Sequence, residues 1–321
     1  MRAGAYGLSL LSDPLDVQVL RALEAGPVPL IDLRRAVGSP PQTTLRKHLR
    51  ALTEIGVLAR QQQREFPAAV WYELTPSGAE LLGTAGTLST WLATAPDGQR
   101  HLGGSAAKSA IKSLVDAWTT RIIRALAARP LSLTELDRLL SGVNYPALER
   151  RLAAMRLSGQ VVPAPGRAGS TPYKASRWLR EAIAPLIAAA NWERRYTPNG
   201  REPLGRLDVE AIFLLAAPLL ELPAGADGSC RLVVDVSNGR QRTLAGAVVA
   251  VERGRPASWT SDLRADVAAT VAGSAAAWLE ALGGGEQSGI EFGGDAELAE
   301  ALIAALRRLA QPRSDSPLSL A

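Results

Sequence analysis

The sequence has a single cysteine, Cys230, and only two histidines, His48 and His101. One cysteine cannot form a disulfide within the chain, and its scarcity favours a reducing compartment, so we expect a cytoplasmic protein. Neither histidine stands at a spacing from cysteine or carboxylate residues that is typical of a metal site or a catalytic triad. We therefore expect no metal, no cofactor and no enzymatic activity.

Long apolar runs are also absent from the sequence. The most apolar stretches, 182–190 and 211–220, are short and each contains a proline, whereas a membrane span needs about 20 residues. No long apolar run follows Met1, so a secretory signal is not expected. The glycines at 283–285 are not followed by a Lys-Ser/Thr pair, which excludes a phosphate-binding loop. The expected class is a soluble binding protein.

Charge is unevenly distributed along the chain. Residues 1–200 carry 25 Lys/Arg and 15 Asp/Glu, whereas residues 201–321 carry 11 and 16. A basic surface attracts polyanions such as nucleic acid, and an acidic one repels them. With 321 residues, 47% of them hydrophobic, the chain can form two or three domains that each have a core. We expect a nucleic-acid partner to bind the first 200 residues.

One segment of the sequence occurs twice. Residues 19–56 align without a gap to residues 122–159, 103 positions later, and 12 of the 38 positions are identical. Most of the identical residues are apolar or turn residues, which indicates two copies of one folded unit. The identical pairs are Arg21/Arg124, Ala22/Ala125, Leu23/Leu126, Ala25/Ala128, Pro27/Pro130, Leu30/Leu133, Leu33/Leu136, Arg35/Arg138, Leu45/Leu148, Leu49/Leu152, Ala51/Ala154 and Gly56/Gly159.

Each copy has the pattern of a helix-turn-helix unit. In the first copy, apolar residues recur at helical spacing in three segments, and the turn at 38–41 separates the second segment from the third. The third segment places Leu45, Leu49 and Leu52 on one face and leaves polar and basic residues on the other. A tight turn before a basic third helix is typical of DNA-binding helix-turn-helix units.

A hairpin, or wing, is predicted after Gly56. Two β-prone runs, 57–64 and 69–74, flank Glu65-Phe66-Pro67. Residues 20–91, and above all the run Phe66-Pro67-Ala68-Ala69-Val70-Trp71-Tyr72-Glu73-Leu74-Thr75-Pro76-Ser77-Gly78, resemble the HxlR-type winged-helix regulators of bacteria. The resemblance implies binding of double-stranded DNA. Many members have a cysteine near their start that some use as a sensor; this chain has none there, so thiol sensing by that route is not expected.

We expect DNA contacts from the third helix, from the wing and from the matching part of the second copy. Arg60 and Arg64, at or near the tip of the wing, suit phosphates or the minor groove. The predicted DNA-binding residues are Gln42, Thr43, Thr44, Arg46, Lys47, Arg50, Arg60, Arg64, Tyr145, Arg150, Arg151 and Arg167.

The second copy has changed more on its expected DNA-binding face. Glu149 stands where the first copy has Arg46, and Ala153 where it has Arg50. Two interpretations stay open: the second copy is a structural partner of the first, or both copies contact DNA. Tethering raises the effective concentration of one copy beside the other in either case.

The helices that flank the two copies are candidates for an assembly contact. Residues 79–95 and 176–196 carry apolar stripes, and in HxlR-type regulators such helices form the dimer surface; alternatively, each helix caps its own domain. A homodimer on a near-palindromic site is one hypothesis, since closed twofold assemblies are the commonest. A monomer whose two copies form an internal pseudo-dimer is its rival.

The character of the sequence changes after residue 204. A helix is expected at 208–220, strands at 229–236, 242–244, 247–252 and 289–292, and helices at 264–272, 273–282 and 295–309. Asn238-Gly239 is a strong hairpin signal, and Asp295 is placed to cap the last helix. Strands and helices in about 110 residues predict an α+β domain.

This last domain resembles the sterol-carrier-protein type 2 fold over residues 207–310. The resemblance rests on the runs 244–259, 262–279 and 293–298. It implies a tunnel for apolar ligands between sheet and helices, although the many alanines at 265–281 fit close helix–sheet packing equally well. The predicted ligand-binding residues are Phe213, Leu232, Val234, Val249, Trp259, Val271 and Trp278.

The predicted fold is mainly α with β wings: two tandem winged helix-turn-helix domains (1–97 and 105–198), a sterol-carrier-like α+β domain (204–311) and a flexible tail (312–321). The predicted function is transcription regulation through DNA binding, controlled by an apolar small-molecule effector bound to the last domain. The alternative is a carrier or scaffold for hydrophobic ligands that uses degenerate winged helices for oligomerisation. A carrier has no reason to keep Arg46, Lys47 and Arg50 together on one helix face.

Overall fold

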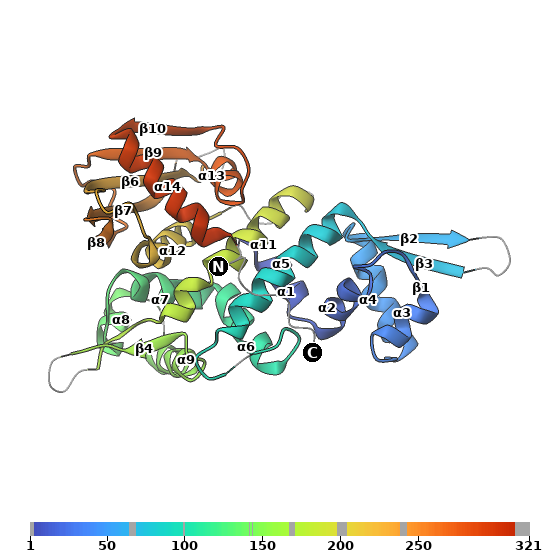
Figure 1. Ribbon diagram of the computed structural model, residues 1–321. Coiled ribbons are helices and arrows are strands. Elements are labelled where there is room, and N and C mark those ends of the chain that lie inside the picture. The colour runs from blue at the N-terminus through green and yellow to red at the C-terminus, as the bar shows by residue number, and fades with distance from the viewer. Residues whose placement is uncertain are drawn as a thin grey trace.

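The computed structural model describes residues 3–63, 69–98, 100–140, 142, 144–166, 171–197, 204–237 and 243–311. Figure 1 shows an elongated molecule with a winged-helix unit at one end, a second helical unit at the other, and a sheet-containing domain beside the second unit. No helix among the described residues is long and apolar enough to cross a membrane.

The first unit contains α1 and α2, the short strand β1, helices α3 and α4, the hairpin β2–β3 and the long helix α5. Their bounds are α1 Ala5–Leu11, α2 Pro14–Ala22, β1 Val28–Pro29, α3 Leu30–Ala36, α4 Gln42–Glu54, β2 Leu58–Gln63, β3 Ala69–Leu74 and α5 Pro76–Ala93. The three-helix arrangement predicted from the apolar spacing is confirmed in α2, α3 and α4.

Apolar residues and end signals fix the position of α4. Leu45, Leu49 and Leu52 are buried in the core of the unit, as the helical spacing predicts. The helix ends where Gly56 adopts a φ of +76° and the Val57 N–H donates to the Leu52 carbonyl oxygen at 2.9 Å. Only glycine adopts this left-handed conformation at little cost, so Gly56 closes the helix and turns the chain into the wing.

The wing is confirmed in its two strands. β2 and β3 pair antiparallel from Leu58 opposite Leu74 to Gln63 opposite Ala69, and β1 adds a short third strand beside β3. The expected turn at 65–67 and the predicted contact residue Arg64 lie outside the described residues.

The second unit follows the same order of elements as the first. Helices α8 and α9 begin and end 103 residues after α3 and α4, and Gly159 has a φ of +72° at the position of Gly56. The hairpin is shorter, and the predicted helix 176–196 is divided at Ala182. The bounds are α6 Ser105–Val115, α7 Ala117–Ala128, α8 Leu133–Leu139, α9 Tyr145–Leu157, β4 Val161–Pro163, β5 Tyr173–Ala175, α10 Arg177–Glu181 and α11 Ile183–Tyr196.

Helices α5 and α11 join the two units at the centre of the molecule (Figure 1). The Trp91 indole N–H donates to the Trp178 carbonyl oxygen, and the Trp192 indole N–H donates to the Ser77 carbonyl oxygen, both at 2.8 Å. Donors and acceptors are related by the same shift of 101 residues, so the contact is nearly twofold symmetric. The Trp91 and Trp178 rings also stack, 4.4 Å apart and 4° from parallel. The predicted contact between the flanking helices is thus present within the chain.

The remaining domain is a five-stranded sheet with helices, which agrees with the α+β prediction. The strand order is β10-β9-β6-β7-β8, with β6 and β9 parallel and the other neighbours antiparallel. The bounds are α12 Arg206–Ala216, a 3-10 turn Ala217–Leu219, β6 Gly228–Asp235, β7 Leu244–Glu252, β8 Arg255–Thr260, β9 Ala269–Ser274, α13 Ala275–Leu282, β10 Ile290–Gly294 and α14 Ala296–Ala310.

The helix expected at 264–272 is wrong, because Ala269–Ser274 forms strand β9 between β6 and β10. Ala269 and Val271 are buried while Thr270 and Ala272 are less so, and this alternation is hard to distinguish from helical spacing in a short alanine-rich segment. The strand expected at 247–252 begins earlier, at Leu244, and forms β7; Thr243 is not in a strand, and residue 242 of the other expected strand lies outside the described residues. The Asn238-Gly239 turn and the tail 312–321 lie outside the described residues.

The last domain packs on the second unit through α12 and α7. Arg124 of α7 is hydrogen-bonded to Glu210 of α12, and the Trp259 indole N–H donates to the Ala127 carbonyl oxygen at 3.0 Å. A second contact joins Arg194 of α11 to Glu280 of α13 at 3.1 Å. The first unit has no such domain on its α2, so the molecule departs from the twofold arrangement here.

Candidate nucleic-acid interface

Helix α4 separates a buried apolar face from an exposed cationic one. Opposite its three core leucines, Arg46 and Lys47 are exposed to solvent. Arg50 is exposed as well, and its Nε donates to Glu54 at 2.7 Å in an exposed pair that adds little stability. The predicted residues Gln42, Thr43 and Thr44 begin the helix and are also exposed. All six predicted residues of this helix are therefore accessible to a nucleic acid.

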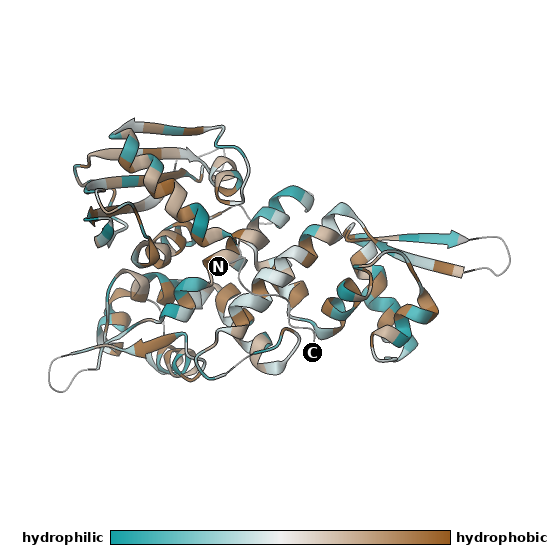
Figure 2. Cartoon of the chain, in the orientation of Figure 1, coloured by the Kyte–Doolittle hydropathy of each residue, from teal (hydrophilic) through white to brown (hydrophobic). Residues whose placement is uncertain are grey.

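The wing extends the polar surface at this end of the molecule. Arg60 is exposed on β2, where it pairs with Tyr72 of β3 in the sheet register. Figure 2 shows that the outer part of β2, away from the helices, is hydrophilic. A hairpin that projects beside a cationic helix suits phosphate contacts next to the groove occupied by the helix.

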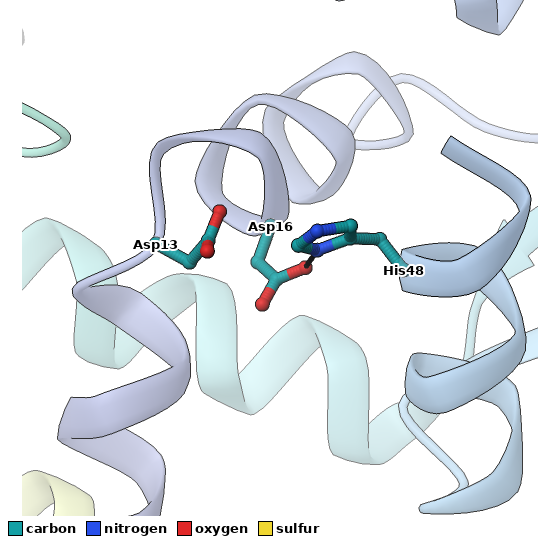
Figure 3. Close-up of side chains that lie close together, drawn as sticks. All are labelled: Asp13, Asp16 and His48. Atoms are coloured by element: carbon teal, nitrogen blue, oxygen red, sulfur yellow. Dashed lines mark hydrogen bonds and ion pairs between the residues drawn. The ribbon is translucent and has the colours of Figure 1, made fainter. Parts of the chain in front are cut away.

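A partly buried hydrogen bond connects α4 to α2. His48 Nδ1 lies 2.7 Å from Asp16 Oδ1 on α2, and Asp16 is only 7% exposed (Figure 3). Burial raises the pKa of the Asp16 carboxyl, the hydrogen bond and charge of His48 act against this rise, and the nearby charge of Asp13 adds to it. Because α2 belongs to the core, this bond sets the orientation in which α4 presents its cations.

Sequence reasoning missed this group of three residues. One ligand-type atom from each of Asp13, Asp16 and His48 lies within 4.8 Å of the other two, and such atoms can hold a divalent cation. Asp13 already accepts the Leu15 N–H at 3.0 Å as the N-cap of α2. The three residues therefore have a structural role: they cap α2 and join it to α4. One signal in the sequence points to Asp13: extending the repeat before residue 19 aligns it with Asp116, 103 residues later, so an aspartate stands at the same position of both copies.

The corresponding helix of the second unit has a different surface. Tyr145 is 44% exposed and Arg150 is exposed, but Glu149 is exposed between them. Arg151 is hydrogen-bonded to Asp116, the N-cap of α7, so this predicted contact residue is engaged within its own unit. The predicted residue Arg167 lies outside the described residues.

Of the predicted ligand-binding residues of the last domain, six are buried and Trp259 is half-buried. Phe213 and Trp278 meet edge to face, 5.1 Å between ring centres, and the Trp278 indole N–H donates to the Val233 carbonyl oxygen. Trp259 instead contacts α7 of the second unit through its indole N–H. The other four, Leu232, Val234, Val249 and Val271, are buried in the core.

Comparison with known proteins identifies the first unit. Residues 10–99 match the family of HxlR-like helix-turn-helix domains. A solved structure described as the transcriptional regulator ytfH from Salmonella typhimurium is 32% identical, with 26% of this chain and 76% of that chain covered and a TM-score of 0.25. Another, described as a transcriptional regulator of the MarR family from Enterococcus faecalis V583, is 28% identical, with 27% and 78% covered and a TM-score of 0.26. Among curated proteins, none matches the chain.

Residues 10–99 therefore form an HxlR-like helix-turn-helix domain. The resemblance inferred from the wing sequence is confirmed for this part of the chain. The match includes α4 and β2, which carry the exposed cations described above, together with β3.

Proposed function

We propose that the protein regulates transcription by binding double-stranded DNA through α4 and the wing of the first unit. The observation that carries this proposal is the exposed face of α4 in an HxlR-like domain, with Arg46, Lys47 and Arg50 opposite a buried leucine stripe. The start of the helix, with Gln42, Thr43 and Thr44, and the cations Arg46 and Lys47 lie in the major groove, where a recognition helix reads bases. Arg50 and Arg60 contact phosphates.

The second unit is, in this proposal, a tandem winged helix that takes the place of a second subunit. Its support is the shared length and spacing of α3/α8 and α4/α9 and the nearly twofold contact between α5 and α11. Since the flanking helices are buried against each other, they are not free to pair with another chain. We therefore favour the internal pseudo-dimer over the homodimer.

The last domain is, in this proposal, the sensory part, as its resemblance to sterol-carrier-type folds implies. Its contact with α7 gives a route by which an effector can act on the second unit. An apolar effector between sheet and helices would have to separate Phe213 from Trp278 and break the bond from Trp278 to Val233. Core packing at these residues favours an effector site outside the sheet–helix layer.

A salt titration with random-sequence duplex DNA tests the DNA-binding proposal. The logarithm of the affinity falls with the logarithm of the salt concentration by about 0.9 per phosphate contact. The double variant Arg50→Ala/Arg60→Ala should therefore reduce the slope by about 2, measured by fluorescence anisotropy. Arg264→Ala, which removes an exposed arginine of the last domain, is the matched control. An unchanged slope in the double variant would mean that α4 and the wing do not contact the DNA phosphates, which would contradict the proposal.

A further inference from the structure

Two adjoining cavities lie where the three parts of the chain meet. The smaller, about 90 Å3, is lined by α5, α10, α11 and α14, and the larger, about 480 Å3, by α10, residues 218–221, β8 and α14. Glu181, Leu219, Arg308 and Leu309 line both, so we treat them as one junction site. Interfaces between domains are a frequent place for small-molecule sites, and the larger cavity has the volume of such a site.

The junction site contains a buried cation, Arg180, that has no carboxylate partner among the described residues. Arg180 lines the smaller cavity and is 8% exposed. Its guanidinium donates to main-chain carbonyl oxygens, Leu214 O at 2.9 Å and Ala127 O at 3.3 Å, and within the described residues it has no carboxylate as a hydrogen-bond partner. Burial lowers the pKa of Arg180 to about 10. A buried charge without a counter-charge is unfavourable, and a bound anion would relieve this cost.

Further arginines surround the two cavities. Arg308 is exposed and lines both, and its Nη2 donates to the Glu221 carbonyl oxygen at 2.7 Å. Within the part of the chain that the structure describes, this guanidinium makes no ion pair with a carboxylate. Arg255 of β8 is exposed at the larger cavity. Arg177 also lies there but donates to Glu181 at 3.0 Å. Arg180 and Arg308 are therefore the two cations that can face an anionic group in the smaller cavity.

The wall of the smaller cavity is largely apolar, whereas the larger cavity presents mostly polar surface. Trp91, Ile183 and Pro185 line the smaller cavity, and Pro218 and Leu220 line the larger one. A ligand that combines one anionic group with an apolar body matches this combination of walls. A fully apolar ligand would leave the charge of Arg180 unbalanced, and an inorganic anion would leave the apolar walls in contact with water.

We propose that the junction site binds a small organic carboxylate with an apolar body. The carboxylate lies at Arg180 and Arg308, which both line the smaller cavity. The apolar body packs against the wall formed by Trp91, Ile183 and Pro185 and extends along Leu219 and Leu309, which line both cavities. Charge-assisted hydrogen bonds from guanidinium groups to a carboxylate are among the strongest in proteins, which gives the site its selectivity for an acid over the matching alcohol.

The position of the site couples ligand binding to the arrangement of the modules. Its walls come from the first unit through α5, from the second through α10 and α11, and from the last domain through α14. A ligand that contacts all three parts binds most tightly to one arrangement of them, and so shifts the protein towards it. This regulatory role rests on the proposed function, whereas carboxylate binding itself does not.

Isothermal titration calorimetry with two acid and alcohol pairs tests the site. Octanoate and benzoate should bind the full-length protein saturably, and 1-octanol and benzyl alcohol should bind at least about 10-fold more weakly. Arg308→Gln should weaken carboxylate binding about 10-fold or more, because it removes one of the two cations. Arg308 is exposed, so its replacement leaves the core intact, and Arg264→Gln is the control for loss of an exposed arginine.

The results separate the site from its regulatory role. Equal binding of acid and alcohol, no binding of either acid, or unchanged binding in Arg308→Gln would each overturn the proposal. If carboxylates bind, their effect on DNA affinity is measured by anisotropy, and we expect a shift in the wild type that is absent in Arg308→Gln. Carboxylate binding in a protein that does not bind DNA would leave the site standing and refute the proposed function instead. Carboxylate binding with no effect on measurable DNA binding would refute only the coupling.

Discussion

The two helix units share their cores and differ on their surfaces. α4 and α9 have the same length and end in the same glycine turn, and Leu45 and Leu49 recur as the buried Leu148 and Leu152. Their exposed faces differ in charge: Arg46, Lys47 and Arg50 in α4 correspond to Glu149, Arg150 and Ala153 in α9. Packing constrains the buried positions of a helix strongly, whereas its exposed positions can change sign without affecting the fold.

The units also differ in the side-chain bond that connects α4 or α9 to the rest of its unit. In the first unit, His48 of α4 is bonded to the buried Asp16. In the second, Arg151, at the position of His48, is bonded to Asp116, at the position of Asp13. The same two helices are thus joined by different residue pairs in the two units.

The largest loss of stability is expected from disrupting the contact between α5 and α11, which joins the two units. Trp91→Ala and Trp192→Ala should each cost about 3–5 kcal/mol, as truncation of a buried aromatic residue does. Because the two side chains make equivalent bonds, the two losses should be similar. Unfolding midpoints in urea, followed by circular dichroism, measure both. Trp118→Ala, at a 39% exposed position, is the control. If Trp91→Ala and Trp192→Ala lose no more stability than this control, the contact between α5 and α11 has no structural role.

The next effect concerns base recognition by the first unit alone. Arg46→Ala should weaken binding to a selected operator by about 1–3 kcal/mol and relax the preference at one base pair if the side chain reads guanine. Arg150→Ala in α9 should change the affinity far less, because Glu149 beside it repels the DNA. Binding to a library of duplexes measures both properties. An equal loss on every sequence would make Arg46 a phosphate contact.

A smaller effect should appear when the second unit is made more like the first. Glu149→Arg removes an acidic group and adds a cation at the position of Arg46. If α9 faces DNA, the affinity for random duplex should rise severalfold and the salt slope should steepen by about 1. No change in slope would indicate that α9 does not approach the DNA and that the second unit is a structural partner.

The smallest effect concerns pH. The pKa of Asp16 is raised, chiefly by burial, so its folded state holds the proton more tightly than the unfolded chain, and this contribution to stability is lost as pH rises through the raised pKa. The pKa of Asp116 is lowered: burial acts to raise it, but hydrogen bonds from Arg151, Trp118 N–H and Thr119 together outweigh burial. Its contribution is present above the unfolded carboxyl pKa and is lost as pH falls through the lowered one.

The variants Asp16→Asn and Asp116→Asn separate these two signs. At pH 7 we expect Asp16→Asn to be at least as stable as the wild type and Asp116→Asn to be less stable, each by less than about 1 kcal/mol. Both differences should shrink as the pH is lowered towards 3. Melting temperatures between pH 3 and 8 provide the measurement, and a loss of stability in Asp16→Asn at pH 7 would contradict the assignment.

Local signals in the sequence determine much of the first unit. Leucines at helical spacing, Gly56 and the β-prone runs predicted α4 and the wing, because each of these elements depends on residues close in sequence. The exposed cations of α4 followed from the same spacing. In contrast, Asp16 and His48 are 32 residues apart, and only the packing of α2 on α4 brings them together.

The last domain shows the limits of local reasoning. The sequence predicts helices at 264–272 and 273–282, but the position of residues 269–274 between β6 and β10 makes them strand β9. The junction site could not be predicted at all, because its residues come from segments more than 200 positions apart, such as Thr87 and Arg308. Trp259 was expected in the domain's interior, yet its partner, Ala127, belongs to another unit.

The contact between α5 and α11 has a consequence for how the protein can change. In a homodimer every substitution occurs in both subunits, so the two halves stay identical. Because the subunits are separate chains, the dimer also dissociates on dilution. Here the two halves are one polypeptide, joined by Trp91 and Trp192. A substitution in one half leaves the other unaltered, and the pair persists at any concentration. The protein can thus lose cations from α9 and gain a third domain on α7 while α4 keeps its surface.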